Sequence, residues 1–222
     1  MRIDKLRANQ NHRSDMRLAW VKPPQQARSE ETLQRMLDAA AHLLEKKSWD
    51  EVGVAELSRR AKASVGAFYA RFEDKDGLLH HLHVSWCEEA KANAAAALAV
   101  ERWQGVPLEQ MVPVIVRLTV DDYETRAGFH REIVRRNSYD AKFRSRSLDV
   151  AKGTIGHITA LLEARKVDEA ARAADMVHRL LFSVLDQHVQ LFSVGELPRG
   201  IKRRTGKELV DEISRALLGY LG

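Results

Sequence analysis

The stretch Ala63–Leu79, ASVGAFYARFEDKDGLL, contains residues that a helix packed only against its own core would avoid. Gly66 costs a helix about 1 kcal/mol relative to alanine, so its presence indicates that something other than helix stability is served. Phe68 and Phe72 are four residues apart, so both rings fall on one face and can anchor it to a core. Near or on the open side are small, apolar and polar residues: Val65, Gly66, Ala67, Tyr69, Ala70 and Arg71. The pattern predicts a short helix with one face free to contact another molecule.

Two capping residues set the limits of the helices in this stretch. Ser64 is a good N-cap for a helix from Val65 to about Phe72. Asp74 can cap the next helix, which starts at Lys75 and continues into the alanine-rich run AKANAAAALAV, a strong helix former.

The chain before this stretch predicts two further helices. Ser29 can cap the first, which has one apolar face over three turns and is broken by Ser48–Asp50. Gly53 can serve as N-cap of the second, about Val54–Ala61, and the tight connection Lys62–Ser64 follows it. Two short helices joined by a tight turn form a helix-turn-helix, whose second helix can enter the major groove of DNA. The alternative is a plain corner of a helical bundle.

From about Arg28 to Glu88 the sequence resembles the DNA-binding domain of TetR-family transcription regulators. The resemblance rests on an ordered set of segments: LDAA and LL in the first helix, Trp49 after it, then VAELSRRA, SVGAFYARF and DKDGLL. It extends more weakly to the chain length and to the helical C-terminal part. It implies an all-α fold in which an N-terminal three-helix helix-turn-helix domain is joined by a continuous helix to a larger C-terminal ligand-binding and dimerisation bundle.

The predicted organisation has three parts. Residues 1–27 form a basic arm that we expect to be disordered, residues 28–88 the helix-turn-helix domain with its motif at about 53–72, and residues 89–222 the effector-binding and dimerisation domain. The net charge is +5, and residues 1–28 carry all of it, with seven Lys or Arg and two Asp. Such an arm is either a solvated tail or a source of phosphate and minor-groove contacts.

The resemblance assigns DNA contacts position by position. Tyr69 and Lys75 match the phosphate-contacting residues, and Val65, Ala67 and Arg71 occupy positions that contact the operator. The full predicted DNA-binding set is Gly53, Lys62, Ser64, Val65, Gly66, Ala67, Tyr69, Arg71 and Lys75.

Four positions depart from the family pattern. Gly53 stands where a serine or threonine is usual, and Lys62 stands where the turn usually has glycine. Val65 and Ala67 replace residues with more polar or bulkier side chains and offer no hydrogen bonds to bases. We therefore expect few hydrogen bonds from this helix to bases, so that Arg71 and the basic arm become more important for DNA binding.

Composition narrows the class of protein. The single cysteine, Cys87, excludes an intrachain disulfide and is typical of a reducing compartment, so we expect a cytoplasmic protein. No apolar run approaches the roughly 18 residues of a membrane helix, and the first 15 residues lack the apolar segment of a secretory signal. No nucleophile, base and orienting group fall at a convincing spacing, so neither an enzyme nor a cofactor is expected.

The C-terminal part predicts five helices, at about 107–122, 123–136, 140–165, 168–194 and 205–221. Gly153 and Gly156 are possible points of close packing in the third. Asp168 can cap the fourth, and Thr205 with Glu208 forms a capping box for the fifth. The last two helices are broadly apolar, and the resemblance implies that they pair with their counterparts in a homodimer.

Several polar clusters in the helices are further candidates. His80, His83 and Cys87 fall at metal-ligand spacing, which makes a helical metal-binding protein or enzyme the rival function; the alternative is surface histidines beside a buried cysteine. The candidates for effector binding are His130, His157, His178, Asp186 and His188. The polar run His130–Arg136 is expected to be a solvated face or to supply an arginine for an acidic effector, and the basic loop 198–207 to be solvated or to contact DNA.

The prediction that joins these observations is a ligand-responsive transcriptional regulator. The resemblance implies a homodimeric repressor that binds a pseudo-palindromic operator in double-stranded DNA and is released by a small-molecule effector. No metal site and no contact with a membrane are expected.

Overall fold

The computed structural model describes residues 27–192, 195 and 197–222, and the regular structure within them is helical. The expected basic arm therefore lies almost wholly outside the described residues, as does the predicted helix end at residue 194. The helices are α1 (Ala27–Leu44), α2 (Val54–Arg60), α3 (Val65–Tyr69), α4 (Lys75–Ala97), α5 (Leu108–Thr125), α6 (Ala127–Tyr139), α7 (Ala141–Glu163), α8 (Ala170–Gln187) and α9 (Gly206–Leu221). Two 3₁₀ turns, η2 (Trp49–Glu51) and η3 (Val100–Trp103), and a π-helical segment, η4 (His188–Phe192), complete the order.

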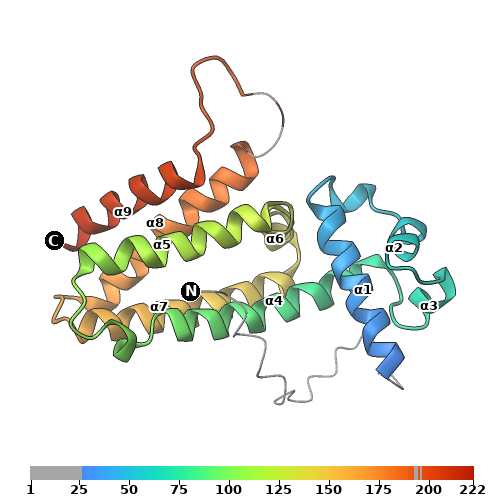
Figure 1. Ribbon diagram of the computed structural model, residues 1–222, viewed down its shortest axis with the longest axis horizontal. Helices are drawn as coiled ribbons and strands as arrows, with labels where there is room; N and C mark the ends of the chain where they lie inside the picture. The colour runs from blue at the N-terminus through green and yellow to red at the C-terminus, as the bar shows by residue number, and fades with distance from the viewer. Residues whose placement is uncertain (1–26, 193–194, 196) are drawn as a thin grey trace.

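Helices α1–α3 form one end of the molecule, and α4 runs from this end into the bundle of α5–α9 (Figure 1). The α1–α3 end has its own apolar core, in which Trp49, Leu57, Phe68 and Phe72 are each completely buried. The two phenylalanines anchor α3, as the i, i+4 spacing predicted. The all-α class and the arrangement of a small helix-turn-helix end beside a larger bundle are thus confirmed.

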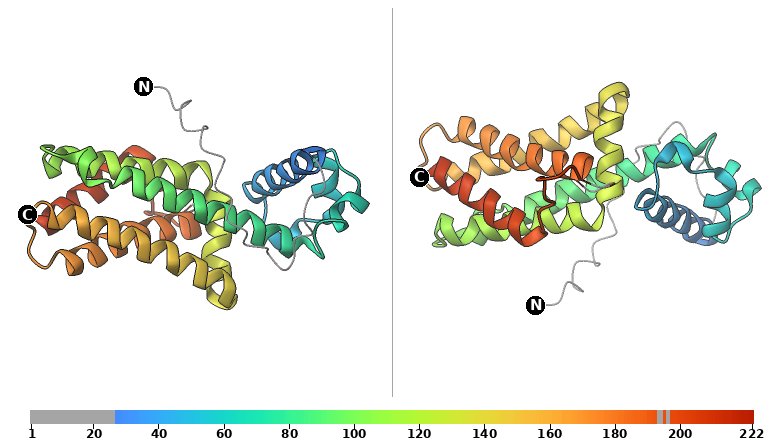
Figure 2. Two further views of the ribbon diagram at one scale, coloured as in Figure 1. Left: turned by 90° about the horizontal axis from the view of Figure 1, so that it is seen from below. Right: turned by 90° about the horizontal axis from the view of Figure 1, so that it is seen from above.

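The bundle has a second core, made where α5 packs against α9 and α7 packs against α4 and α8. Helix α6 runs across the end of the bundle that faces α1–α3 (Figure 2). Its residues Phe129 and Ile133, together with Phe143 of α7, are buried in the core of the α1–α3 end. The two ends of the molecule therefore share side chains through α6.

Several helix boundaries differ from those predicted from capping residues in the sequence. Helix α1 begins at Ala27, so Ser29 lies inside its first turn and is not its N-cap. Helix α3 ends at Tyr69, three residues early, because Ala70 already closes it with bonds to carbonyls of the same turn. Asp168 does not cap α8, since Glu169 takes that position with a left-handed φ of 49°.

The break between α5 and α6 falls at Arg126, so Tyr123 belongs to α5 and not to the following helix. Gly153 and Gly156 are exposed, and an added Cβ at either would meet nothing within 4 Å, so neither is a point of close packing among the described residues. Helix α9 starts with the predicted capping box of Thr205 and Glu208.

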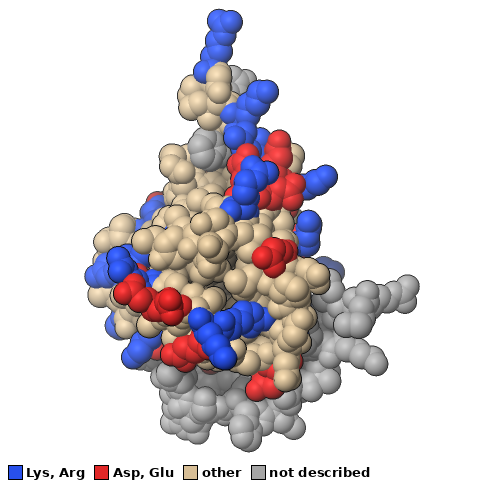
Figure 3. Space-filling model, turned by 90° about the vertical axis from the view of Figure 1, so that its left-hand side faces the viewer, with Lys and Arg blue, Asp and Glu red and all other residues tan. Residues whose placement is uncertain are grey.

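The loop between α8 and α9 projects from the bundle (Figure 1). Figure 3, which views the end of the bundle away from α1–α3, shows basic side chains at the tip of this loop and charges of both signs below it. Its basic residues Arg199, Lys202, Arg203 and Arg204 are exposed, and Arg204 pairs with Glu212 of α9. In the part of the chain that the structure describes, no helix combines the length and the apolar character that crossing a membrane requires.

Candidate functional site

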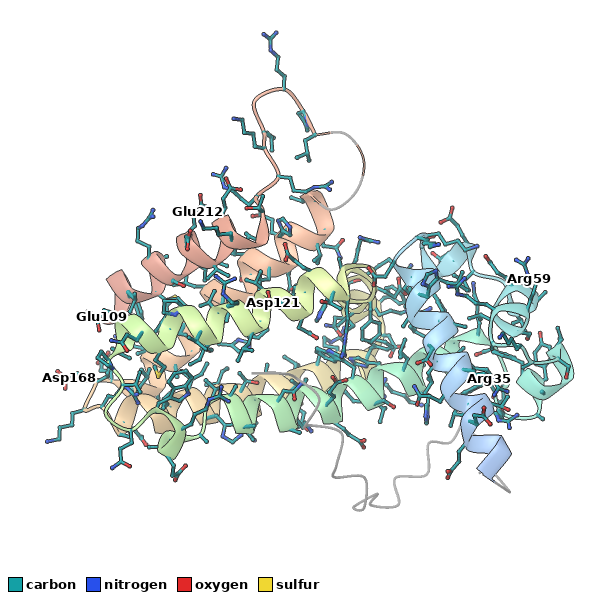
Figure 4. The ribbon with its side chains drawn as sticks, viewed as in Figure 1. Arg35, Arg59, Glu109, Asp121, Asp168 and Glu212 are labelled. Atoms are coloured by element: carbon teal, nitrogen blue, oxygen red, sulfur yellow. The ribbon has the colours of Figure 1, made fainter. Side chains whose placement is uncertain are left out.

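Helix α3 presents an open face to solvent at the end of the molecule farthest from the bundle (Figure 1). Val65 is 43% exposed and Tyr69 50% exposed, whereas Phe68 between them is completely buried. The Ser64 hydroxyl accepts a hydrogen bond from the amide of Ala67 at 3.0 Å, which confirms Ser64 as the N-cap. Arg35 and Arg59 lie at this end of the molecule, and Glu109 and Asp168 lie at the opposite end (Figure 4).

Two of the four departures from the family pattern lie before α3, one at the start of α2 and one in the turn between the two helices. Gly53 is the N-cap of α2, and a Cβ there would meet nothing within 4 Å, so a serine or threonine would fit without rearrangement. Lys62 has a φ of 52°, the left-handed region that favours glycine and costs other residues about 1 kcal/mol or more. The tight turn is therefore formed at a cost in strain, and it leaves the Lys62 side chain exposed.

Lys75 holds the end of the Trp49–Glu51 turn. Its ammonium donates to the carbonyl oxygens of Trp49 at 2.8 Å, Val52 at 3.0 Å and Asp50 at 3.1 Å. An ammonium has three donors, so these bonds occupy all of them. The side chain predicted to contact phosphate thus ties the start of α4 to the loop before α2, and a phosphate would have to share or displace one of these bonds.

Arg71 turns back toward α1 and does not point out from α3. Its guanidinium donates to the Ser29 hydroxyl at 2.7 Å, to the Ser29 carbonyl at 3.2 Å and to the Ala67 carbonyl at 3.0 Å. In this structure the arginine therefore fixes the first turn of α1 against the end of α3. This turn directly follows the predicted basic arm in the sequence.

Gly66 has no intramolecular reason to be glycine. It lies in the first turn of α3 with an ordinary φ, and an added Cβ would meet only the Ser64 hydroxyl at 3.8 Å. We expect Gly66→Ala to raise the free energy of unfolding by about 0.5–1 kcal/mol, because alanine loses less backbone entropy in a helix. We expect the same change to weaken DNA binding, because the Cβ stands where the helix would approach the groove.

Urea unfolding and fluorescence anisotropy with labelled DNA measure these two effects on one protein sample. Gly153→Ala is the matched control, since Gly153 is also helical and exposed with nothing within 4 Å, but it lies on α7. It should stabilise the fold and leave DNA binding unchanged. Gly66→Ala should raise the free energy of unfolding and lower the affinity for DNA. Equal DNA affinities of Gly66→Ala and wild type would contradict the prediction.

The cluster at His80, His83 and Cys87 comes together as the spacing predicted, with the Cys87 thiol 3.5 Å from His83 Nε2. His83 is completely buried, so it is not a surface histidine, and burial lowers its pKa to about 3. Arg146 of α7 donates to His83 Nδ1 at 3.3 Å and lies 2.7 Å from His80 Nδ1. Among the described residues no group of three His, Cys, Asp or Glu side chains is arranged to hold a metal ion, so the geometry does not favour the metal-binding alternative.

A second polar cluster lies inside the bundle, where α5, α6 and α8 meet. The Tyr123 hydroxyl donates to Asp186 at 2.7 Å, and the Tyr123 ring stacks on His130 with centroids 3.8 Å apart. His130 Nε2 lies 2.8 Å from Asp122. The phenol of Tyr123 has a pKa well above its ordinary value because it is buried beside Asp186.

Three of the five candidate effector-binding residues are in or beside this cluster. His130 and Asp186 are members, and His178 packs on Phe182, whose ring is 6.2 Å from that of Tyr123. His157 is half-buried on α7 and is not among the side chains that this cluster joins. His188 starts the π-helical segment after α8, where burial is the first cause that lowers its pKa.

The sequence suggested that the polar run of α6 is a solvated face, but the structure buries most of it. His130, Glu132 and Arg136 are each no more than 6% exposed. Arg136 makes two hydrogen bonds to Asp76 of α4, at 2.7 and 3.1 Å, and one to Glu132 at 2.9 Å. Sequence periodicity missed this because the partner of Arg136 is 60 residues away and is reached only when α6 crosses the bundle.

The other members of this ion network extend it toward α2. Arg135 bridges Glu132 and Asp50, and the Trp49 indole donates to Asp76 at 2.8 Å. Burial by itself would raise the pKa of Asp76, but the hydrogen bonds from Arg136 and Trp49 together with the charges of Arg136 and Lys75 leave the pKa below its ordinary value. The network therefore attaches the C-terminal end of α6 to the residues that frame the helix-turn-helix.

The N-terminal end of α6 is attached to the same part of the molecule. The Glu45 carboxylate, just after α1, accepts from the amides of Gly128 at 2.9 Å and Phe129 at 3.3 Å, a favourable arrangement at a helix N-terminus. A Cβ built on Gly128 would lie 2.0 Å from the carbonyl oxygen of Leu44. Only glycine lets α6 approach α1 this closely, and nothing in the sequence around Gly128 signals it.

Comparison with known proteins gives a consistent picture. Residues 36–82 match the model of the bacterial regulatory proteins of the tetR family. An uncharacterised HTH-type transcriptional regulator of Bacillus subtilis, YwcC, is 40% identical over 57 residues, which is 26% of this chain and 26% of that relative. This chain thus spans about a quarter of the length of the curated relative that it matches.

Solved structures share the fold over most of the chain. A TetR-family regulator of Mesorhizobium loti has a TM-score of 0.69 at 16% identity and covers 88% of this chain and 98% of its own. A regulator of Rhodococcus sp. Rha1 has a TM-score of 0.66 at 14% identity, with 85% and 95% covered. The fatty acid degradation regulator FadR of Bacillus halodurans has a TM-score of 0.62 at 16% identity, with 85% and 95% covered. Residues 36–82 thus form a helix-turn-helix domain of the tetR family of bacterial regulatory proteins, and the chain as a whole shares the fold of these solved regulators.

Proposed function

We propose that this chain is a repressor that binds a pseudo-palindromic operator as a homodimer and leaves it when a small molecule binds the bundle. The observation that carries the proposal is the open face of α3, a motif-matched helix that is anchored by two buried phenylalanines and exposes Val65 and Tyr69. A helix held in this way can enter the major groove without losing its own packing.

The predicted contacts divide into two kinds. Val65 and Ala67 supply apolar contacts of the sort that recognise thymine methyl groups, and Tyr69 supplies a hydroxyl for a phosphate. Arg59 and Arg60 of α2 and Lys62 of the turn are exposed beside them, so their charges add a term that depends on salt. We assign Lys75 and Arg71 positioning roles, because their charged groups are already bonded within the fold.

A dimer is supported by apolar side chains that α8 leaves uncovered. Met176, Leu180 and Val184 follow one another at four-residue spacing and are 36–40% exposed. Helix α9 packs beside α8 and adds Tyr220, which is 44% exposed. A second copy of the same two helices would cover this surface, and two copies of α3 would read two half-sites of a palindrome.

Release by an effector is supported by the attachments of α6. The helix contacts the bundle through His130 and is tied to the α1–α3 end through Gly128 and Arg136. A molecule that moves α6 would therefore change how the two α3 helices are held. Allostery requires that such a molecule bind the two positions of α6 with different affinity.

The proposal is tested with DNA from upstream of the chain's own coding region. We expect the chain to bind it in preference to unrelated DNA of the same length, with an affinity that falls steeply as salt rises. Tyr69→Phe, which removes one hydroxyl, should lower the affinity by roughly threefold to tenfold. Tyr139→Phe is the control, since Tyr139 is also exposed but belongs to α6. Equal binding to both DNAs would show that the proposal is wrong.

A further inference from the structure

Two histidines of α4 share one arginine of α7. Arg146 Nη2 lies 2.7 Å from His80 Nδ1, and Arg146 Nε donates to His83 Nδ1 at 3.3 Å. His83 is completely buried and stacks on the Phe143 ring with centroids 3.7 Å apart. Because a guanidinium can only donate hydrogen bonds, Nδ1 of each imidazole must accept and therefore carries no proton.

The second nitrogen of each ring carries the proton. His80 Nε2 lies 3.0 Å from the carboxylate of Asp140, to which it donates. His83 Nε2 lies 3.2 Å from the Ser147 hydroxyl, and this hydroxyl itself donates to Asn137 Oδ1 at 3.0 Å, so it accepts from the ring. Both imidazoles are thus neutral and fixed in one tautomer. A further proton on Nδ1 would replace a hydrogen bond from the arginine by a contact between two cations.

The two histidines and the arginine hold α4 against the corner between α6 and α7. Asp140 stands at this corner, where its carboxylate caps α7 by accepting from two backbone amides of the first turn. Leu78 and Leu79, which precede His80 on α4, are completely buried in the core of the α1–α3 end. The place of α4 at this point therefore sets how the helix-turn-helix lies relative to the bundle (Figure 1).

We propose that His80, His83 and Arg146 form a proton-sensitive joint, which holds α4 at neutral pH and releases it in acid. This inference rests on the proposed binding to an operator. The rings take up protons only when they leave the arginine and meet water, so protons bind the open joint and shift the population toward it. A released α4 no longer holds the two α3 helices of a dimer at one spacing, and the operator is then bound less tightly.

Charged groups around His80 act in both directions on its pKa. Burial is the largest effect and lowers the pKa, and the charges of Arg146 and Arg136 act in the same direction. The carboxylates of Asp140 and Asp76 favour the protonated ring, but they leave the pKa below the ordinary value of 6.5. The closed joint therefore resists protonation of His80, although a carboxylate accepts from its Nε2.

His83 resists protonation more strongly. Burial is the largest cause, and with the charges of Arg146 and His80 it lowers the pKa to about 3, against the effect of Asp140. The Cys87 thiol beside it supplies no compensating charge, because burial raises the pKa of that thiol to about 11. Since both histidine pKa values lie below that of an exposed histidine, about 6.5, the open joint binds more protons in the range between. Each histidine then shifts the equilibrium toward the open joint by up to about tenfold for each pH unit in this range.

Operator binding by the full chain at about pH 7.5 and about pH 5.5 tests the joint in wild type and His80→Gln. The glutamine oxygen can still accept from Arg146 but takes up no proton in this range. We expect the wild-type affinity to fall by about tenfold or more in acid, and the fall in His80→Gln to be at least about threefold smaller. Added positive charge alone would strengthen DNA binding in acid, so a fall has the opposite sign. His157→Gln is the control, since His157 lies on α7 outside the cluster, and it should keep the wild-type fall.

Nitrogen NMR spectra of the imidazoles in the wild-type chain at neutral pH give a second measurement, which needs neither a variant nor DNA. We expect an unprotonated Nδ1 and a protonated Nε2 for both His80 and His83. A protonated Nδ1 at either ring, an operator affinity that does not fall in acid, or an equal fall in wild type and His80→Gln would each overturn the inference.

Operator binding at the higher pH separates this inference from the proposed function. If the chain binds its operator there and equally well in acid, the joint is wrong and the DNA-binding role stands. If the chain binds no operator at either pH, the proposed function is wrong. The joint is then judged by the nitrogen spectra and by urea unfolding, in which acid must lower the stability of wild type more than that of His80→Gln.

Discussion

Gly128→Ala should lower the free energy of unfolding by about 3 kcal/mol or more, because the new Cβ would lie within 2.0–2.7 Å of backbone atoms of Leu44 and Glu45. Backbone on both sides cannot rotate away as a side chain can, so α6 must separate from α1. Separation also breaks the two hydrogen bonds from the Gly128 and Phe129 amides to the Glu45 carboxylate. For a chain of this length the expected fall in melting temperature is about 6–12 °C.

Gly156→Ala is the matched control for this prediction. Gly156 also lies within a helix, α7, but it is exposed, and an added Cβ would meet nothing within 4 Å. Alanine there should stabilise the protein by about 0.5–1 kcal/mol. Calorimetric melting of both variants measures the difference, and a Gly128→Ala protein that melts within a degree of wild type would disprove the close approach of α6 to α1.

Arg136→Met is the second change with a large expected effect, a loss of about 3 kcal/mol in the free energy of unfolding. Methionine fills a similar volume, but the change leaves the buried Glu132 and the carboxylate of Asp76 without the guanidinium that joins them. We also expect weaker operator binding, because Asp76, Trp49 and Lys75 together hold the loop that leads into α2.

Arg172→Met controls for the loss of an arginine in general. Arg172 pairs with Glu169, but both side chains are more than two-thirds exposed, so its removal should change stability by no more than about 0.5 kcal/mol. Urea unfolding of the two variants makes the comparison. Adding Asp76→Asn to Arg136→Met should cost less than the two single changes summed, since the residues share one interaction. Strict additivity would mean that this ion pair contributes nothing.

The sequence by itself determined the helix-turn-helix and the class of protein. Rules that act within four residues predict the cap at Ser64, the anchors Phe68 and Phe72, and the open face with Tyr69. The structure has each of them where the rules place it. The same holds for the capping box of Thr205 and Glu208 and for Gly53 at the start of α2. The nine predicted DNA-contacting residues remain predictions, although the structure puts Val65, Gly66 and Tyr69 on the exposed side.

What only the tertiary structure decided are the interactions that join distant segments. The guanidiniums of Arg71 and Arg136 look alike as exposed basic groups in the sequence, yet one binds Ser29 and the other is buried against Asp76. The phosphate contact of Lys75 stays a prediction, but only the structure shows that its ammonium donates to three carbonyl oxygens of the loop before α2. Helical periodicity reports only which face of a helix is apolar, whereas a buried charge is set by which partner the crossing of helices brings within reach, and that crossing depends on Gly128, a residue without a side chain to signal it.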